Sequence, residues 1–300
     1  MKKSVITVPN SFLKQPTKKV KQFEDNLKKQ IAEMFEVLRS EKGMGIAANQ
    51  IGYDNNVILI EFKDPKGKEN IPFTVVINPE IIKTSEEKEC FEEGCLSVPQ
   101  IELDVERASK IKIKYQNEKG KIIKAAPKGL FARILQHEVD HLNGIIFTER
   151  VKEQFFTQYP ELKKLKILFC GSGEFAAVIL KGLILLGFDL TIVTEQAKPA
   201  GREKLTYPTP VAKVAKEFGK QFIETEESPV PFKDTSPTIS QREIGAYALG
   251  LASASRNHAA RPAPRFSERV SLAFSLLRKK VPLRPKLINT LTILLMDVIL

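Results

Sequence analysis

The first 152 residues carry apolar side chains with two periods, one typical of helices and one typical of strands. Residues 23–42 repeat apolar side chains every three or four positions, which predicts an amphipathic helix that ends at Gly43. Residues 127–144 repeat the same period and predict a second helix with Gly144 as its C-cap. The apolar faces comprise Leu27, Ile31, Met34, Phe35 and Leu38 in the first helix, and Leu130, Ile134, Leu135, Val139 and Leu142 in the second.

Strand-like segments lie between these two helices. NVILIEF (56–62) and TVVINP (74–79) are strand-like runs, and KIKIKYQ (110–116) alternates strictly. The alternation predicts a strand with one buried face and one face lined with lysine. NEKG (117–120) predicts a hairpin turn into a further short strand. A helix, several antiparallel strands and a closing helix together predict an α+β domain over residues 1–152.

The pattern changes after residue 152. Residues 153–163 are charged, and we expect them to form a linker. Residues 165–193 have the pattern of a strand, a glycine turn, a helix and a strand, which predicts the opening βαβ unit of a parallel sheet. We therefore expect an incomplete α/β, Rossmann-like segment over residues 164–227. Residues 228–300 are rich in arginine and alanine, and we expect an irregular basic tail there.

The net charge of +11 is concentrated at one end of the chain. Residues 236–300 hold 10 Lys and Arg against 3 Asp and Glu, which accounts for +7 of the total. The remaining +4 lies in residues 1–235, where acidic and basic residues are interspersed, as is typical of a solvated surface. Two interpretations of the tail stay open: a basic extension that contacts RNA or an acidic surface, and a frame-shifted reading of the gene.

Cysteine usage and the lengths of the apolar runs indicate a cytoplasmic protein without a membrane partner. The 3 cysteines are an odd number and few for 300 residues, so they do not suggest a disulfide framework. The N-terminus lacks the apolar segment of a signal peptide. The longest apolar stretch, residues 287–300, is too short and too polar to span a bilayer.

The motif QHEVDH holds the candidate chemistry. Residues four apart on a helix share a face, so His137 and His141 can direct their rings at one metal ion. Glu138 follows the first histidine and can reach a water on that ion as a general base. The alternative is a surface helix that has this sequence by chance.

A catalytic metal site usually takes three protein ligands, and two candidates exist for the third. His258 lies downstream in the basic tail, whereas Cys95 lies upstream in the strand-like segment EEGCLSVP. A thiolate with two imidazoles would leave one position open on the ion. Cys90 lacks the same flanking residues, and we interpret it as a small buried hydrophobic side chain.

The stretch GMGIAANQIG surrounds Gln50 with glycines and alanines. Small residues permit close approach of the backbone to a ligand. The amide of Gln50 offers N–H donors that suit a developing oxyanion. The alternative for this stretch is a helix C-cap followed by a loop, which explains Gly43 only.

The motifs GMGIAANQ, EGCLS and QHEVDH together resemble, in order and spacing, the three signature motifs of the peptide deformylases. The resemblance covers residues 1–152 and implies an α+β fold with a metal-bearing helix. It implies that Cys95, His137 and His141 hold Fe²⁺, with Zn²⁺, Ni²⁺ or Co²⁺ as substitutes, and that Glu138 is the general acid and base.

The same resemblance implies the substrate and further site residues. The family removes the formyl group from the N-terminal methionine of new proteins, so the expected partners are N-formylmethionyl nascent peptides near the ribosome. Gln50 and the backbone N–H of Leu96 would form the oxyanion hole, and Gly45 would pair with the peptide backbone. Ile46 and Ile134 would help to line the methionine pocket.

Residues 164–227 resemble the beginning of methionyl-tRNA formyltransferase, including a K-P-A-G-R loop at Lys198–Arg202. The catalytic Asn-x-His pattern of that family is absent, so we expect a truncated fragment without transferase activity and no tRNA partner. Three alternatives remain open: a bifunctional fusion that also formylates, a general HExxH metallopeptidase, and a binding protein without catalysis.

Overall fold

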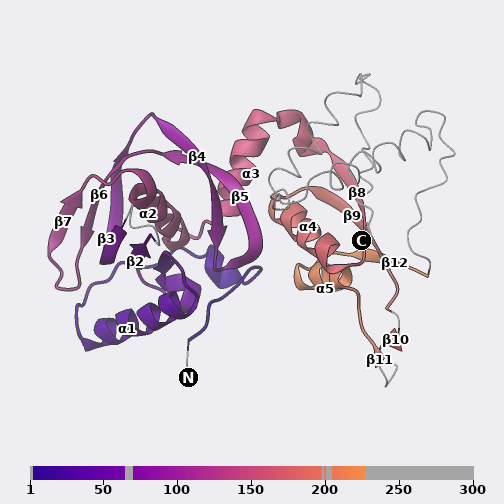
Figure 1. Ribbon diagram of the computed structural model, residues 1–300, viewed down its shortest axis with the longest axis horizontal. Coiled ribbons are helices and arrows are strands. Elements are labelled where there is room, and N and C mark those ends of the chain that lie inside the picture. Colours follow the sequence, from indigo (N-terminus) through magenta and orange to yellow (C-terminus); the bar gives the residue numbers. More distant parts are fainter. Residues whose placement is uncertain (1–2, 65–69, 198, 201–204, 227–300) are drawn as a thin grey trace. The chain divides into compact units, whose positions relative to one another are not determined.

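The computed structural model describes residues 3–64, 70–197, 199–200 and 205–226 (Figure 1). The chain divides into two compact units, one of residues 1–163 with 185–187 and one of residues 164–184 with 188–300. The tail expected at 228–300, His258 within it and most of the K-P-A-G-R loop lie outside the described residues.

The first unit alternates helices with antiparallel strands. Its elements are η1 (Ser11–Lys14), α1 (Asp25–Ser40), β1 (Gly45–Ala47), η2 (Ala48–Ile51), β2 (Val57–Lys63), β3 (Asn70–Thr84), β4 (Lys88–Cys95), β5 (Val98–Ala108), β6 (Ile111–Gln116), β7 (Ile122–Ala125), α2 (Gly129–Leu142), α3 (Phe147–Gln158) and η3 (Pro160–Lys164). The α+β class and both predicted helices are therefore confirmed, and the hairpin from β6 into β7 is present as expected.

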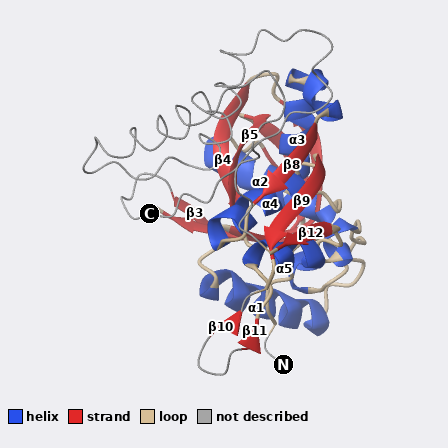
Figure 2. Ribbon diagram, turned by 90° about the vertical axis from the view of Figure 1, so that its right-hand side faces the viewer, coloured by secondary structure: helices blue, strands red, loops and turns tan. Residues whose placement is uncertain are grey.

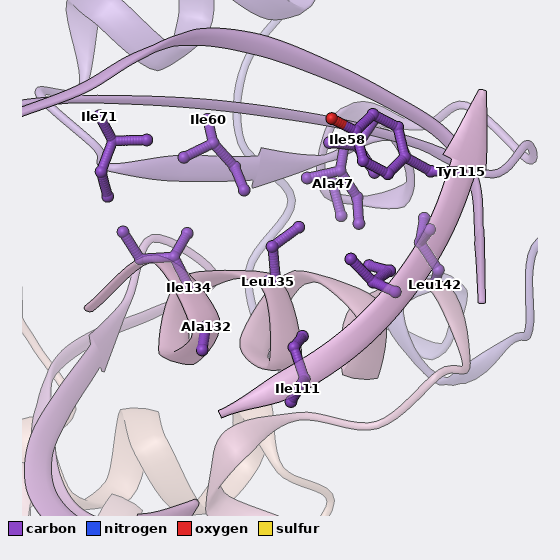
Figure 3. Close-up of a cluster of buried hydrophobic side chains, with 12 residues drawn as sticks. Ala47, Ile58, Ile60, Ile71, Ile111, Tyr115, Ala132, Ile134, Leu135 and Leu142 are labelled. Carbon is purple, nitrogen blue, oxygen red and sulfur yellow. The ribbon is translucent and has the colours of Figure 1, made fainter. Parts of the chain in front are cut away.

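A five-stranded antiparallel sheet, in the order β1-β2-β3-β6-β7, separates two hydrophobic clusters. Successive residues of a strand point to opposite faces, so β2 contributes Val57 and Leu59 to the cluster under α1. Ile58 and Ile60 enter the other cluster, where they meet Leu135 of α2 (Figure 3). The sheet thus holds α1 and α2 on opposite faces, which fixes the helix that carries both histidines.

The strands β4 and β5 form a separate antiparallel ribbon, of which the sequence analysis identified only the strand-like segment EEGCLSVP. Cys95 pairs with Val98, so Leu96 and Ser97 make the connection between the two strands. Ile101, Leu103 and Val105 are buried in alternation along β5. This ribbon brings the end of β4 to the metal-ligand motif of α2.

Residues 153–163, expected as a linker, are largely helical. The helix α3 runs from Phe147 to Gln158, across the boundary that charge alone suggested at residue 152. Its polar residues proved misleading because an amphipathic helix at the edge of a domain exposes one charged face.

The second unit contains the strand, turn, helix and strand expected at residues 165–193. Its elements are β8 (Lys166–Cys170), α4 (Glu174–Leu185), β9 (Asp189–Glu195), β10 (Pro199–Ala200), β11 (Leu205–Thr206), α5 (Pro210–Glu217) and β12 (Phe222–Thr225). A three-stranded parallel sheet runs in the order β12-β9-β8, with α4 and α5 as its connecting helices (Figure 2). Among the described residues, no helix has both the length and the apolar character needed to cross a membrane.

The end of α1 differs in detail from the expectation. The left-handed residue is Lys42, with φ of 54°, and not Gly43. The N–H of Lys42 donates to the carbonyl of Arg39, and that of Gly43 donates to Leu38, which is a Schellman motif with lysine at the position glycine favours.

We therefore predict that Lys42→Gly increases the free energy of unfolding by about 1 kcal/mol, because it removes the strain of a Cβ in the left-handed region. Urea denaturation of the full chain measures the change. The matched control is Lys29→Gly in the middle of α1, which we expect to decrease stability by about 1 kcal/mol. A loss of stability in Lys42→Gly would contradict the prediction.

Candidate metal centre

The helix α2 presents His137 and His141 on one face, as their spacing predicts. Ile134, Leu135 and Leu142 on the same helix pack into the hydrophobic cluster of the sheet (Figure 3). This packing holds the helix in one rotation about its axis. The centroids of the two imidazole rings lie 5.0 Å apart, so both rings can reach a single ion.

Cys95 joins the two histidines from the end of β4. Its Sγ lies 3.2 Å from Nε2 of His141. The ligand atoms of Cys95, His137 and His141 all lie within 4.8 Å of one another, and no other such group occurs among the described residues. Two ligand atoms on one zinc ion are at most about 4.6 Å apart, because each lies about 2.0–2.3 Å from the metal. The three side chains therefore fit one divalent ion after a small adjustment.

Glu93 fixes the orientation of His137. Its Oε2 lies 3.0 Å from Nδ1 of His137, which leaves Nε2 as the nitrogen available to an ion. A carboxylate behind a ligating histidine is a recurrent feature of metal sites, because it sets the tautomer and the ring orientation. Burial opposes ionisation of Glu93, but hydrogen bonds from His137 and Arg107 lower its pKa to about 2.

In the absence of an ion, the pKa values of the two histidines are shifted in opposite directions. Burial acts to lower the pKa of His137, but its hydrogen bonds with Cys95 and Glu93 raise that pKa well above the usual value. Burial lowers the pKa of His141 well below the usual value. A metal needs both rings neutral, so binding an ion would release a proton from this cluster.

Glu138 is a buried carboxylate beside the three ligands. Only 4% of its surface is exposed, and its Oε2 has no hydrogen-bond partner within the described chain. Burial raises its pKa to about 7. A carboxyl group that is neither a ligand nor part of an ion pair can accept and release a proton near neutral pH.

Gly45 permits β1 to pass directly over Glu138. A Cβ on Gly45 would lie 2.5 Å from Oε1 of Glu138 and 2.9 Å from Cγ2 of Ile134. Any side chain here would displace the carboxylate or the helix. The glycine is therefore required by the close approach of β1 and α2.

Gln50 is held with its amide nitrogen toward Cys95. Its Oε1 accepts from the backbone N–H of Ala47 at 2.8 Å, so the N–H₂ end must point the other way. That end donates to Oγ of Ser97 at 3.1 Å and lies 3.6 Å from Sγ of Cys95. Leu96 lies in the connection between Cys95 and Ser97 and is half-buried. The structure thus brings Gln50 and Leu96 to the same edge of the cluster.

Two expectations fail in the structure. Ile46 is fully buried in the cluster under α1, whereas Ile134 lies in the cluster under α2. Consecutive residues of β1 point to opposite faces of the sheet, so Ala47 joins Ile134 in the cluster under α2 and the side chain of Ile46 points away from it. Cys90, expected as a buried hydrophobic residue, is exposed on β4.

The sequence analysis missed a buried network of charges around Glu93. Arg107 donates to both oxygens of Glu93, at 2.6 and 2.9 Å, and Arg133 donates to Oε1 at 2.7 Å. Arg107 also donates to Oδ2 of Asp140 at 2.8 Å. A signal was present, because Arg107 continues the inward alternation of Ile101, Leu103 and Val105 along β5 and so carries a charge at a core position.

Comparisons with known proteins match the part of the chain in which these residues lie. Residues 2–155, about half of the chain, match the Polypeptide deformylase family. Peptide deformylase from Aquifex aeolicus is 41% identical over 154 residues, which cover 51% of this chain and 89% of the relative. Peptide deformylase from Picosynechococcus sp. is 39% identical over 145 residues, which cover 48% of this chain and 76% of the relative.

The crystal structure of peptide deformylase from Thermotoga maritima is 37% identical in sequence and covers 50% of this chain and 97% of that one, with a TM-score of 0.45. The assignment rests on the family match and on the two sequence relatives. They show that this chain belongs to the polypeptide deformylase family.

Proposed function

We propose that Cys95, His137 and His141 hold one divalent metal ion, and that Glu138 and Gln50 act on a formyl group bound beside it. As a deformylase, the chain hydrolyses the formyl group from N-terminal N-formylmethionine in a metal-dependent reaction. The observation that carries the residue assignment is the convergence of three ligand atoms beside a buried carboxylate.

We propose Fe²⁺ as the native ion, with Zn²⁺, Ni²⁺ or Co²⁺ as substitutes, from the resemblance to the deformylases, and the donor set is compatible with each of them. One soft thiolate and two imidazoles suit iron and zinc and do not suit magnesium or calcium. A bound ion would polarise the formyl oxygen and lower the pKa of a water molecule to about 7. Three protein ligands leave an open position for this chemistry.

Glu138 accepts a proton from the attacking water and passes it to the leaving amine. Burial raises its pKa to about 7 in the metal-free protein, and a weakly acidic carboxyl group suits a role as base in one step and acid in the next. The amide of Gln50 and the backbone N–H of Leu96 donate to the oxyanion that develops on the formyl group. Ala47 holds the Gln50 amide in the donating orientation before the substrate arrives.

The substrate is an N-formylmethionyl nascent peptide, and its backbone pairs with β1 at Gly45. Ile134 of α2 lies next to Gly45 of β1 and lines the pocket for the methionine side chain. A formyl group is the smallest acyl group, so the narrow approach between Gly45 and Glu138 selects it sterically. Because nascent peptides are made on the ribosome, the proposed substrate implies a cytoplasmic enzyme that works close to the ribosome.

Residues 164–227 are, on this proposal, a fragment similar to the beginning of methionyl-tRNA formyltransferase. The parallel order of β8, β9 and β12 supports a partial α/β fold. The catalytic Asn-x-His pattern of that family is absent from the chain, so the fragment transfers no formyl group and binds no tRNA. The thiolate of Cys95 argues against a general HExxH peptidase, and the missing Asn-x-His pattern argues against a bifunctional fusion that also formylates.

We predict that Glu138→Gln keeps its metal but loses about 10²–10⁴-fold in kcat, because the amide cannot shuttle the proton. Formyl-Met-peptide hydrolysis and elemental analysis of the same sample measure the two effects. Glu36→Gln, an exposed carboxylate on α1, is the matched control and should retain full activity. A metal-loaded Glu138→Gln enzyme with unchanged turnover would exclude the proton-transfer role.

We predict that Gln50→Leu lowers kcat by about 10²–10³-fold with little change in KM, because its donor acts mainly in the transition state. Ser97→Ala serves as control, since it removes the hydroxyl that accepts from Gln50 but leaves the amide in place. Its kcat should stay within a few-fold of the wild-type value. If Gln50→Leu raised KM and left kcat intact, Gln50 would be a ground-state binding residue instead.

A further inference from the structure

The helix α3 holds two side chains that reach back toward the metal-ligand helix and β5, and the proposed reaction uses neither. Arg150 makes a bidentate ion pair with Asp140, with Nη2 donating to Oδ1 at 2.6 Å and Nε donating to Oδ2 at 3.2 Å. Asp140 lies between His137 and His141 on α2, and its side chain is only 8% exposed. Arg150 therefore contacts the ligand helix at the residue that precedes a metal ligand.

The ion pair continues from Asp140 to a metal ligand. Arg107 spans Asp140 and Glu93, with Nη1 on the first carboxylate at 2.8 Å and Nε on the second at 2.6 Å. Oε2 of Glu93 in turn lies within hydrogen-bond distance of Nδ1 of His137, at 3.0 Å. The chain Arg150–Asp140–Arg107–Glu93–His137 is continuous and links α3, α2, β5 and β4.

The side chain of Gln154 hydrogen-bonds to the backbone of β5 next to Arg107. Its Oε1 accepts from the N–H of Glu106 at 3.1 Å, and its Nε2 donates to the carbonyl of Glu106 at 2.8 Å. Glu106 directly precedes Arg107. The helix α3 thus holds the backbone next to Arg107 through Gln154, and the carboxylate of Asp140, which also accepts from Arg107, through Arg150.

The two carboxylates compete for Arg107, and Arg150 reduces that competition. With Arg150 present, Asp140 has a second guanidinium, so Arg107 can remain bidentate on Glu93. Without it, Oδ2 of Asp140 keeps Arg107, but Oδ1 loses its hydrogen bond from Arg150 in a nearly buried position, where an unsatisfied acceptor is costly. Arg107 would then shift toward Asp140 and loosen its hold on the carboxylate that orients His137.

We infer that Arg150 is a positioning residue for the metal centre, acting through Asp140, Arg107 and Glu93 on the orientation of His137. The inference rests on the proposed metal site. It adds α3 to the elements that the reaction requires, although the helix holds none of the ligands.

The test is anaerobic titration of the full chain with Co²⁺ in wild type, Arg150→Gln, Arg150→Lys and Lys152→Gln. The readouts are the dissociation constant and the visible absorption bands of the bound ion, with thermal unfolding as a check on folding. We expect about 10-fold weaker binding and altered bands in Arg150→Gln, the lower end of the range for residues behind metal ligands. Arg150→Lys keeps the charge without the bidentate geometry, so it should restore part of the affinity.

Lys152→Gln removes an equal charge from the same helix at an exposed position, and it should bind Co²⁺ as the wild type does. Wild-type affinity and bands in folded Arg150→Gln would overturn the inference while leaving the metal site intact. A similar loss in Lys152→Gln would also overturn it, because a general charge effect would then explain the result. Failure of the wild type itself to bind Co²⁺ would instead refute the proposed metal site.

Discussion

The buried ion pair between Arg107 and Glu93 is the interaction on which the metal centre depends. Both side chains are almost fully buried, at 5% and 6% exposure. Glu93 lies two residues before Cys95 on β4, and the same carboxylate meets His137 on α2. The pair therefore fixes the strand that carries Cys95 relative to the helix that carries His137 and His141. Loss of either partner would remove one ion pair from a buried network and leave Glu93 only Arg133, or Arg107 only Asp140, as its remaining charged partner, which destabilises the buried charge.

The hydrophobic architecture explains why these charges can be buried at all. One face of α2 packs on the sheet through residues such as Leu135. Another face of α2 contacts β5 of the β4–β5 ribbon. The glycine at position 45 then lets β1 close over Glu138, and the amide of Asn49 donates to the carbonyl of His141 at 2.5 Å. The residues of the proposed site thus come from three separate segments, each held by contacts among the protein's own residues.

The sequence predicted those helices and site residues that belong to a periodic pattern or to a motif. The spacing of His137 and His141 and the small residues around Gln50 indicated the site, and the helical period indicated α1 and α2. Interactions between distant segments left weaker signals. The face on which Ile46 lies could not be assigned from the sequence, because β1 has only three residues and its alternation is too short to read. The proposed role of α3 left no signal in the sequence, because Arg150 and the residues that it is linked to lie in separate segments. The second half of the helix, residues 153–158, was expected to be part of a linker.

The most direct test of this account is the metal content of the chain when Cys95 is replaced. The full chain, purified without oxygen from cells supplied with iron, should contain one divalent ion per molecule, and folded Cys95→Ala should contain almost none. The reason is that two imidazoles alone form an incomplete ligand set. Cys90→Ala, on the exposed face of β4, should retain the full complement. An undiminished metal content in Cys95→Ala would contradict the assignment of the site.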